Sequence, residues 1–146
     1  MLLENKNAVI YGGSGSVGGA VARTFAREGA RVFLAGRTLT TLDKVAEEIR
    51  SAGGVAETAQ VDALDEQAVD RYIDAVAEKA GGIDISFNLI SYEDVQGTPL
   101  AEMPLKDFER PVMTAVRTQF LTSRAAASHD QTGIRGDPHV RWLGRP

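Results

Sequence analysis

The sequence contains no cysteine, which excludes disulfide bonds, thiol nucleophiles and cysteine-ligated metal sites. It has two histidines, His129 and His139, both in a glycine-, proline- and arginine-containing stretch without periodicity, and we assign neither a specific role. No hydrophobic run is long enough to cross a bilayer, and the first residues lack the apolar core of a signal peptide. From these absences we expect a cytoplasmic protein without membrane contact.

An excess of positive charge is also lacking. The formal net charge is −4, from 16 lysines and arginines against 20 acidic residues. Surfaces that bind nucleic acid need a cationic patch for the phosphates, so this balance argues against nucleic acid as the main partner. The 146 residues, 43% of them hydrophobic, are enough for one domain with a sizeable core.

What the sequence does contain is a glycine-rich stretch, YGGSGSVGG, at residues 11–19. The apolar run at residues 8–10 predicts a buried strand before it, and Val17, Val21 and Phe25 recur at helical spacing after it. Between a strand and a helix, glycines let the main chain approach a pyrophosphate, whose charge the helix N-terminus binds. The stretch therefore predicts a dinucleotide site; a turn that only packs the helix against a sheet is the alternative.

Further strands are predicted at residues 31–35, 55–61 and 83–89, with amphipathic helices between them. The buried faces of these helices are Leu42, Val45, Ala46 and Ile49 in the first, and Val69, Tyr72, Ile73 and Val76 in the second. Alternating strands and helices predict a parallel sheet, and right-handed crossovers give the strand order 3-2-1-4. The predicted fold is a Rossmann-type α/β domain of three layers.

Beyond the fourth strand, residues 91–104 predict a loop and residues 105–128 a long helix. Pro111 lies inside this helix, and proline has no amide hydrogen for the helical hydrogen bond. We therefore expect a break there, with the main helix starting at Pro111.

The end of the second strand predicts which dinucleotide is preferred. An acidic residue there would accept hydrogen bonds from the adenine ribose and select NAD, but the sequence has Gly36 followed by Arg37. A guanidinium can bind a 2′-phosphate through two hydrogen bonds. We predict NADP(H) over NAD(H); a solvated surface arginine is the alternative.

On these residues the chain resembles the short-chain dehydrogenase/reductase family over residues 5–127. Its glycine turn is similar to the family's TGxxxGxG pattern, with Tyr11 for threonine and Ser16 for the middle glycine. Asp62 matches an aspartate associated with the adenine ring, and Asn88 matches the first asparagine of the family's NNAG segment. The resemblance fails at residues 89–91, which depart from that segment.

The resemblance implies NADP(H)-dependent oxidation or reduction of an alcohol or carbonyl substrate. Its implied cofactor residues lie in the glycine turn and after three strands: Gly12, Ser14, Gly15, Ser16, Val17, Gly18, Arg37, Asp62, Ala63 and Asn88. For Asp62 and Asn88, a turn or capping role is the alternative.

The family's catalytic Tyr-x-x-x-Lys pair has no counterpart in the sequence. Tyr11 lies in the phosphate turn, Tyr72 faces the core, and Tyr92 is followed by Gln96 where the lysine is required. The family's catalytic asparagine is replaced by Ala115. We name no catalytic residue and expect an inactive fragment; a divergent branch with another catalytic arrangement, a non-catalytic NADP(H)-binding module and a non-functional truncated product are the alternatives.

Residues 128–146 show neither helical nor strand periodicity. One permitted back-translation of residues 128–144, shifted by one base, encodes a helix end, a glycine turn and an apolar strand that resemble what the family has here. We hypothesise that residues 128–146 are out of frame and that later strands of the sheet are missing. Because the fourth strand would then be an uncovered edge, we expect self-association through it.

Overall fold

The computed structural model describes residues 1–129. Its elements alternate between strands and helices: β1 (Asn7–Tyr11), α1 (Ser16–Arg27), β2 (Arg31–Gly36), α2 (Leu39–Ser51), β3 (Val55–Gln60), α3 (Glu66–Ala80), β4 (Ile85–Asn88), a short 3-10 helix η1 (Leu100–Glu102) and α4 (Leu105–Ala127). The proposed frameshift concerns a tail that, apart from its first two residues, lies outside the described part of the chain.

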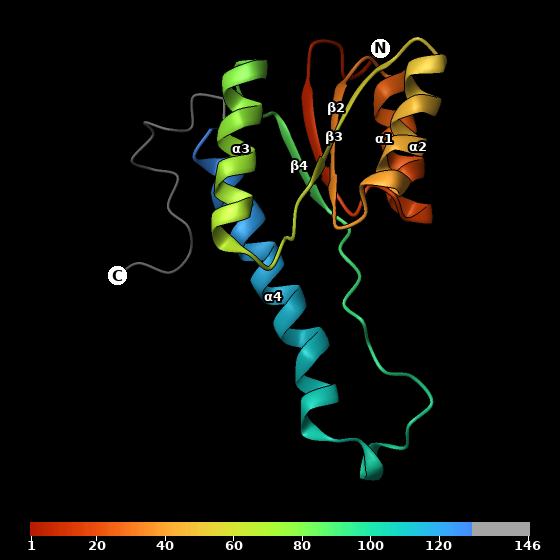
Figure 1. Ribbon diagram of the computed structural model, residues 1–146, viewed down its shortest axis with the longest axis vertical. Helices are drawn as coiled ribbons and strands as arrows, with labels where there is room; N and C mark the ends of the chain where they lie inside the picture. The colour runs from red at the N-terminus through yellow and green to blue at the C-terminus, as the bar shows by residue number, and fades with distance from the viewer. Residues whose placement is uncertain (130–146) are drawn as a thin grey trace.

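The four strands form one parallel sheet in the order β3-β2-β1-β4. Helices α1 and α2 cover one face of the sheet, and α3 and α4 cover the other (Figure 1). The predicted Rossmann-type three-layer fold and its strand order are confirmed.

Alternate residues of the central strand β1 enter two separate cores. Ala8 and Ile10 pack in the core under α1 and α2, whereas Val9 and Tyr11 pack in the core under α3 and α4. Side chains of a strand alternate between its faces, so one apolar run supplies both cores. The predicted buried faces of α2 and α3 are confirmed, with Tyr72 only partly buried.

The ends of α3 follow from single residues. Asp65 is its N-cap, and its carboxylate accepts a hydrogen bond from the amide of Ala68 at 3.0 Å. Gly81 ends the helix in the left-handed conformation, with φ of 87°, which glycine adopts without a Cβ clash. Aspartate at the N-cap and glycine after the last turn are therefore sufficient to explain where α3 begins and ends.

Helix α1 lies close to the sheet through its smallest residues. Gly18, Gly19 and Ala22 are buried, whereas Val17 at the start of the helix is 61% exposed. Small side chains let the helix axis approach the strands, and they leave the first turn open at the surface.

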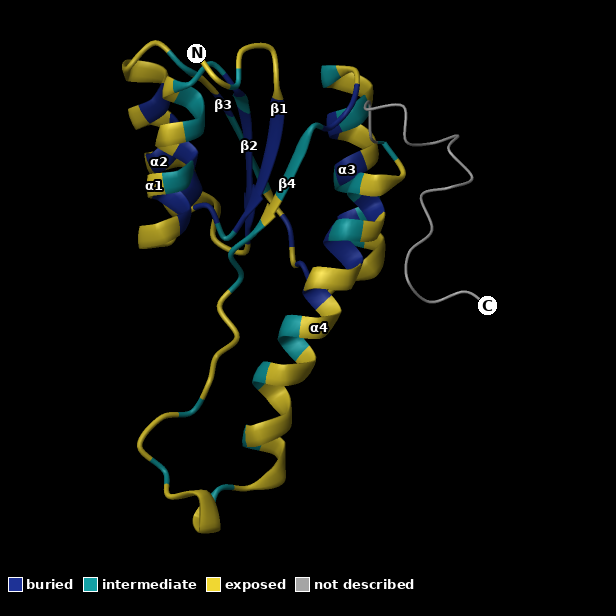
Figure 2. Cartoon of the chain, turned by 180° about the vertical axis from the view of Figure 1, so that it is seen from behind, coloured by how far each residue is buried: buried dark blue, intermediate teal, exposed yellow. Residues whose placement is uncertain are grey.

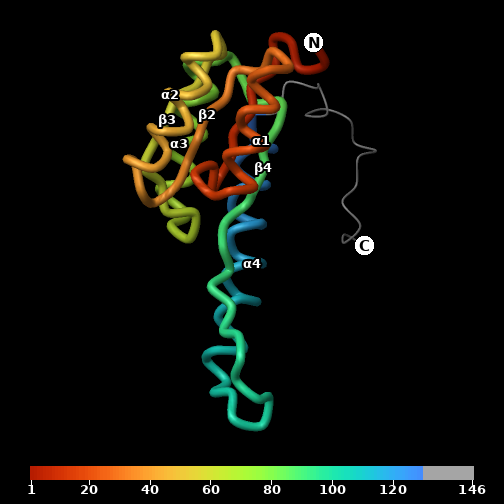
Figure 3. Tube along the Cα trace, turned by 90° about the vertical axis from the view of Figure 1, so that its right-hand side faces the viewer, coloured from red at the N-terminus to blue at the C-terminus, as the bar shows by residue number. Residues whose placement is uncertain are grey.

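Helix α4 runs without interruption through Pro111, so the predicted break is wrong. The buried residues of α4 begin at Thr118, and the part before it extends beyond the sheet beside the loop that follows β4 (Figure 3). Proline at this position removes the amide that would donate to the carbonyl of Asp107. Because the neighbouring residues 108–110 are exposed, water can hydrate that carbonyl and the helix can continue.

Strand β4 is shorter than the predicted strand at residues 83–89. It has four residues, of which Phe87 is 37% exposed, and within residues 1–129 it pairs only with β1. Figure 2 shows the contrast in burial with β1 and β2, which are buried except for the half-buried first residue of β2.

In the described part of the chain, no helix combines the length and hydropathy that a membrane crossing requires.

His129, to which the sequence assigned no role, connects the end of α4 to α3. Its Nε2 lies 2.7 Å from a carboxylate oxygen of Asp74. His139 lies outside the described residues.

Candidate functional site

The glycine turn is held by two close main-chain approaches. Gly12 has a φ of 75°, and a Cβ there would overlap the carbonyl of Leu89 after β4. A Cβ on Gly18 would overlap the carbonyl of Gly12, so α1 starts directly against the turn. These two positions therefore require glycine, which agrees with the resemblance to TGxxxGxG.

The first turn of α1 is left without a capping side chain. Gly15 is the N-cap, no side chain among residues 1–129 caps the helix, and the first turn has no acidic residue. The amide of Gly15 donates to the carbonyl of Gly12 at 3.1 Å. The exposed residues Ser16 and Val17 therefore present amide groups at the positive end of the helix dipole. A Cβ on Gly15 would have only an ordinary contact, 3.5 Å from the carbonyl of Gly12, so this side of the turn has room for a phosphate.

A small cavity of about 70 Å³ lies where β2, β3 and β4 end, beside α4. It brings together three of the predicted cofactor residues with residues of the loop after β4 and of α4: Arg37, Asp62, Ala63, Leu64, Ile90, Ser91, Glu93, Thr114 and Thr118. Ligands of parallel α/β sheets bind beyond the carboxyl ends of the strands, which is where this cavity lies.

Arg37 is held at both its main chain and its side chain. Its carbonyl accepts a hydrogen bond from Gln60 Nε2 at 2.9 Å, and its guanidinium forms an ion pair with Glu93 at 3.0 Å. Both charged side chains are more than half exposed, at 68% and 53%. The sequence did not indicate Glu93, because the partner lies in a loop that only the fold brings to the end of β2.

Asp62 and Asn88 both have the turn roles that the sequence left as alternatives. Asp62 accepts a hydrogen bond from the amide of Leu64 at 2.9 Å. Asn88 accepts one from the amide of Ile90 at 3.0 Å and donates one to the hydroxyl of Thr118 at 3.1 Å. Asn88 thus connects the end of β4 to α4, while Asp62 keeps an exposed carboxylate at the cavity.

Tyr11 is the last residue of β1. The sequence placed it in the phosphate turn, and this prediction is wrong. Its ring is fully buried and contacts that of Tyr72 edge-on, with the centroids 6.1 Å apart. Burial raises the pKa of both phenols far above their ordinary value; Asp70 adds to the effect on Tyr11, and Tyr11 and Glu57 to that on Tyr72. Neither hydroxyl has a hydrogen-bond partner in the described residues, and neither phenol is suited to proton transfer near neutral pH.

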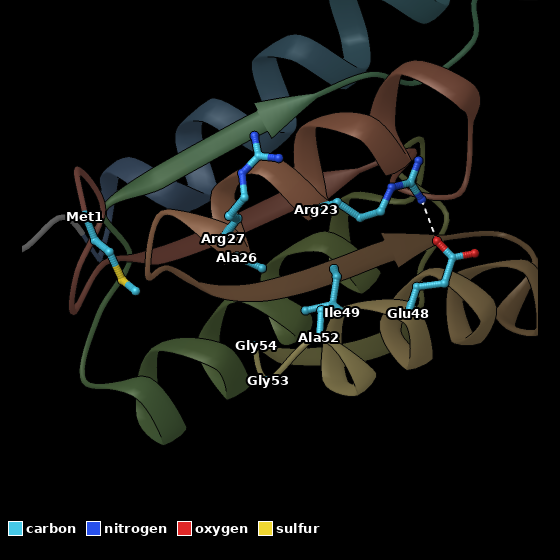
Figure 4. Close-up of a pocket in the computed structure, with 9 residues that line it drawn as sticks. All are labelled: Met1, Arg23, Ala26, Arg27, Glu48, Ile49, Ala52, Gly53 and Gly54. Atoms are coloured by element: carbon cyan, nitrogen blue, oxygen red, sulfur yellow. Dashed lines mark hydrogen bonds and ion pairs between the residues drawn. The ribbon is translucent and has the colours of Figure 1, made fainter.

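A larger pocket of about 420 Å³ lies at the carboxyl ends of α1 and α2, beside Met1 (Figure 4). Figure 4 shows Arg23 pointing to Glu48, with which it forms an ion pair at 2.8 Å. No predicted cofactor residue lines this pocket, and helix carboxyl ends disfavour anions. The glycine turn and the small cavity together are therefore the candidate site.

A sequence model of the family described as short chain dehydrogenase matches residues 6–137. The chain belongs to the short-chain dehydrogenase family. The family consists of oxidoreductases that bind NAD(P), and the glycine turn and its uncapped helix fit the phosphates of such a cofactor.

Individual relatives agree with this assignment. The uncharacterized oxidoreductase YxbG of Bacillus subtilis (strain 168) is 37% identical over 122 residues, which are 84% of this chain and 44% of the relative. A short-chain type dehydrogenase/reductase from Mycobacterium marinum is 34% identical, with a TM-score of 0.76 over 87% of this chain and 51% of the other. A metagenomic short-chain oxidoreductase, solved in complex with NADP, is 29% identical, with a TM-score of 0.75 over 88% of this chain and 57% of the other.

The chain spans less than half the length of two curated relatives. It covers 44% of the oxidoreductase YxbG and 49% of gluconate 5-dehydrogenase from Gluconobacter oxydans. What those whole proteins do therefore comes to this chain only as a proposal.

Proposed function

We propose that this chain binds NADP(H) and represents the cofactor-binding part of a short-chain dehydrogenase that acts on an alcohol or carbonyl substrate. The observation that carries the proposal is the uncapped start of α1, held against the turn by Gly12 and Gly18, next to the cavity that contains Arg37. The complex of the metagenomic relative with NADP supports the choice of cofactor.

In this proposal each part of the site has one binding role. The amides of Ser16, Val17 and Gly18 at the start of α1 bind the pyrophosphate, with Gly15 leaving room for it. Arg37 binds the 2′-phosphate, which NAD(H) lacks. Asp62 and Ala63 contact the adenine, and Asn88 fixes the strand end from which the substrate side of the site would continue. The nicotinamide of the bound cofactor would supply the hydride chemistry.

Titration of the purified chain with NADPH and NADH tests the preference for the phosphorylated cofactor. We expect tighter binding of NADPH, and we expect Arg37→Ala to remove about 1.5–3 kcal/mol of that preference because a charge-assisted bidentate contact is lost. Arg27→Ala is the matched control, since it removes the same charge from an exposed position on α1 outside the cavity. An unchanged preference in Arg37→Ala would refute the role of Arg37.

A second candidate is a non-catalytic NADP(H)-binding module, and Ala115 favours it, since the resemblance implies a catalytic asparagine at this position. Turnover distinguishes the two, because a module binds NADPH without oxidising it in the presence of any member of a carbonyl panel. Oxidation would instead indicate a divergent catalytic arrangement. A chain that neither stays soluble nor binds cofactor would be a non-functional truncated product.

We also propose self-association through the open edge of β4. Among the described residues 1–129 this strand pairs on one side only, and unpaired edge groups are a template for another strand. Size-exclusion chromatography over a concentration series should show species larger than the monomer; a sharp monomer peak at every concentration would contradict this.

We also propose the cytoplasmic location that the sequence predicts, and cell fractionation tests it.

A further inference from the structure

We propose that Glu93 is a selectivity residue for the cofactor, because its carboxylate occupies Arg37 until a 2′-phosphate displaces it. This inference rests on the proposed function, since it concerns the same site. It adds a residue that neither the glycine turn nor the resemblance indicates.

The geometry places the competing carboxylate where the 2′-phosphate is expected. Arg37 directly follows β2, and Glu93 lies 56 residues later, in the loop after β4, with its carboxylate 3.0 Å from the guanidinium. The main chain of Arg37 is fixed by the hydrogen bond from Gln60. The guanidinium can therefore exchange one anion for another without a movement of β2.

The small volume of the cavity also indicates that Glu93 competes with the cofactor for Arg37. With the ion pair formed, the space lined by Arg37, Asp62 and Glu93 is about 70 Å³. Pockets for small ligands are typically about 300–1,000 Å³. The space beside the guanidinium is therefore too small to take a 2′-phosphate together with the Glu93 carboxylate, and Glu93 belongs to the loop that can move away while the sheet stays in place.

The main chain at Glu93 favours such a movement. Its φ is 55°, in the left-handed region that non-glycine residues rarely adopt. Within residues 1–129 its amide is held only by a long hydrogen bond, 3.4 Å from the hydroxyl of Ser91. Releasing the loop relieves this strain, and the contact with Arg37 opposes the release.

Calorimetric titration of the full chain with two probes isolates the effect. 2′,5′-ADP carries the 2′-phosphate, and 5′-AMP lacks it. We expect Glu93→Gln to raise the affinity for 2′,5′-ADP about two- to fivefold, the range of an exposed ion pair, and to leave 5′-AMP unchanged. In the Arg37→Ala background, Glu93→Gln should have no effect on either probe, because the carboxylate then has no guanidinium to occupy.

Asp94→Asn is the matched control, because it removes the same charge from the next residue, whose carboxylate binds Gln96 and not Arg37. An equal gain from Asp94→Asn and Glu93→Gln would reduce the effect to net charge and overturn the inference, while leaving the proposed function intact. A gain that survives in the Arg37→Ala background would overturn it as well. If no variant binds 2′,5′-ADP although thermal melts show folded protein, the proposed function fails and the inference with it.

Discussion

The two sides of the sheet differ in how completely they are covered. Strands β1 and β2 have neighbours on both edges and helices on both faces, and Ile10 and Leu34 are fully buried. In the described part of the chain, strand β4 has one neighbour, and all of its four residues are half-buried or exposed. The buried residues of its covering helix α4 begin at Thr118. The difference indicates that β1 and β2, which lead into the glycine turn and Arg37, are stabilised by their own neighbours. Their stability does not depend on a further strand beside β4.

Replacing an isoleucine by alanine in β1 and in β4 should give the largest difference in the free energy of unfolding. Ile10→Ala removes a fully buried side chain, and we expect it to lower the free energy of unfolding by about 2–5 kcal/mol. Ile85→Ala in β4, where the side chain is only partly buried against the same core, should cost less than half of that. Urea unfolding of both variants measures the contrast, with Ile10→Val as a milder variant at about 0.5–1.5 kcal/mol. Equal losses at Ile10 and Ile85 would show that β4 is as well covered as β1.

The glycine turn lies on the covered side, and two of its glycines separate folding from binding. Gly18→Ala places a methyl group against the Gly12 carbonyl, so we expect a loss of about 1–3 kcal/mol of stability as well as weaker NADPH binding. Gly15→Ala meets only an ordinary contact, so its melting temperature should stay near that of the wild type while NADPH affinity falls about tenfold. Binding by Gly15→Ala at wild-type affinity would place the phosphates elsewhere.

Tyr11 gives the smallest expected effect, and it depends on pH. The hydroxyl is buried without a partner among residues 1–129, so Tyr11→Phe should keep or raise stability, by about 1 kcal/mol. Burial raises the pKa of this phenol, so the folded state favours the neutral form. The stability linked to this shift is fully present below the ordinary tyrosine pKa of about 10 and is lost as the pH rises above it.

Unfolding of Tyr11→Phe should accordingly set in at a higher pH than that of the wild type in alkaline titrations followed by circular dichroism. Tyr92→Phe is the control, because Tyr92 is 42% exposed. Identical alkaline transitions in the wild type and Tyr11→Phe would show that the Tyr11 hydroxyl is solvated in the folded protein.

Local patterns were sufficient to predict the covered side of the molecule. The strand order, the buried faces of α2 and α3 and both ends of α3 depend on periodicity and on single residues such as Asp65 and Gly81. The glycine turn also follows from nearby residues, because the clash that fixes Gly18 is with Gly12.

The features that could not be predicted depend on long-range packing. Pro111 is tolerated because that part of α4 extends beyond the sheet, which no local pattern reveals. From the sequence alone, Tyr11 is assigned to the glycine turn. In the structure it belongs to β1, because the register of β1 with β2 pairs it with Ala35. Glu93 contacts Arg37 only because the loop after β4 meets the end of β2.

Calorimetric titration of the folded chain with NADPH tests the central claim most directly. Phosphate binding at the start of α1 predicts saturable heat with NADPH, a weaker response to NADH, and loss of the difference in Arg37→Ala. Folded protein that responds to neither cofactor at roughly millimolar concentration would contradict the account.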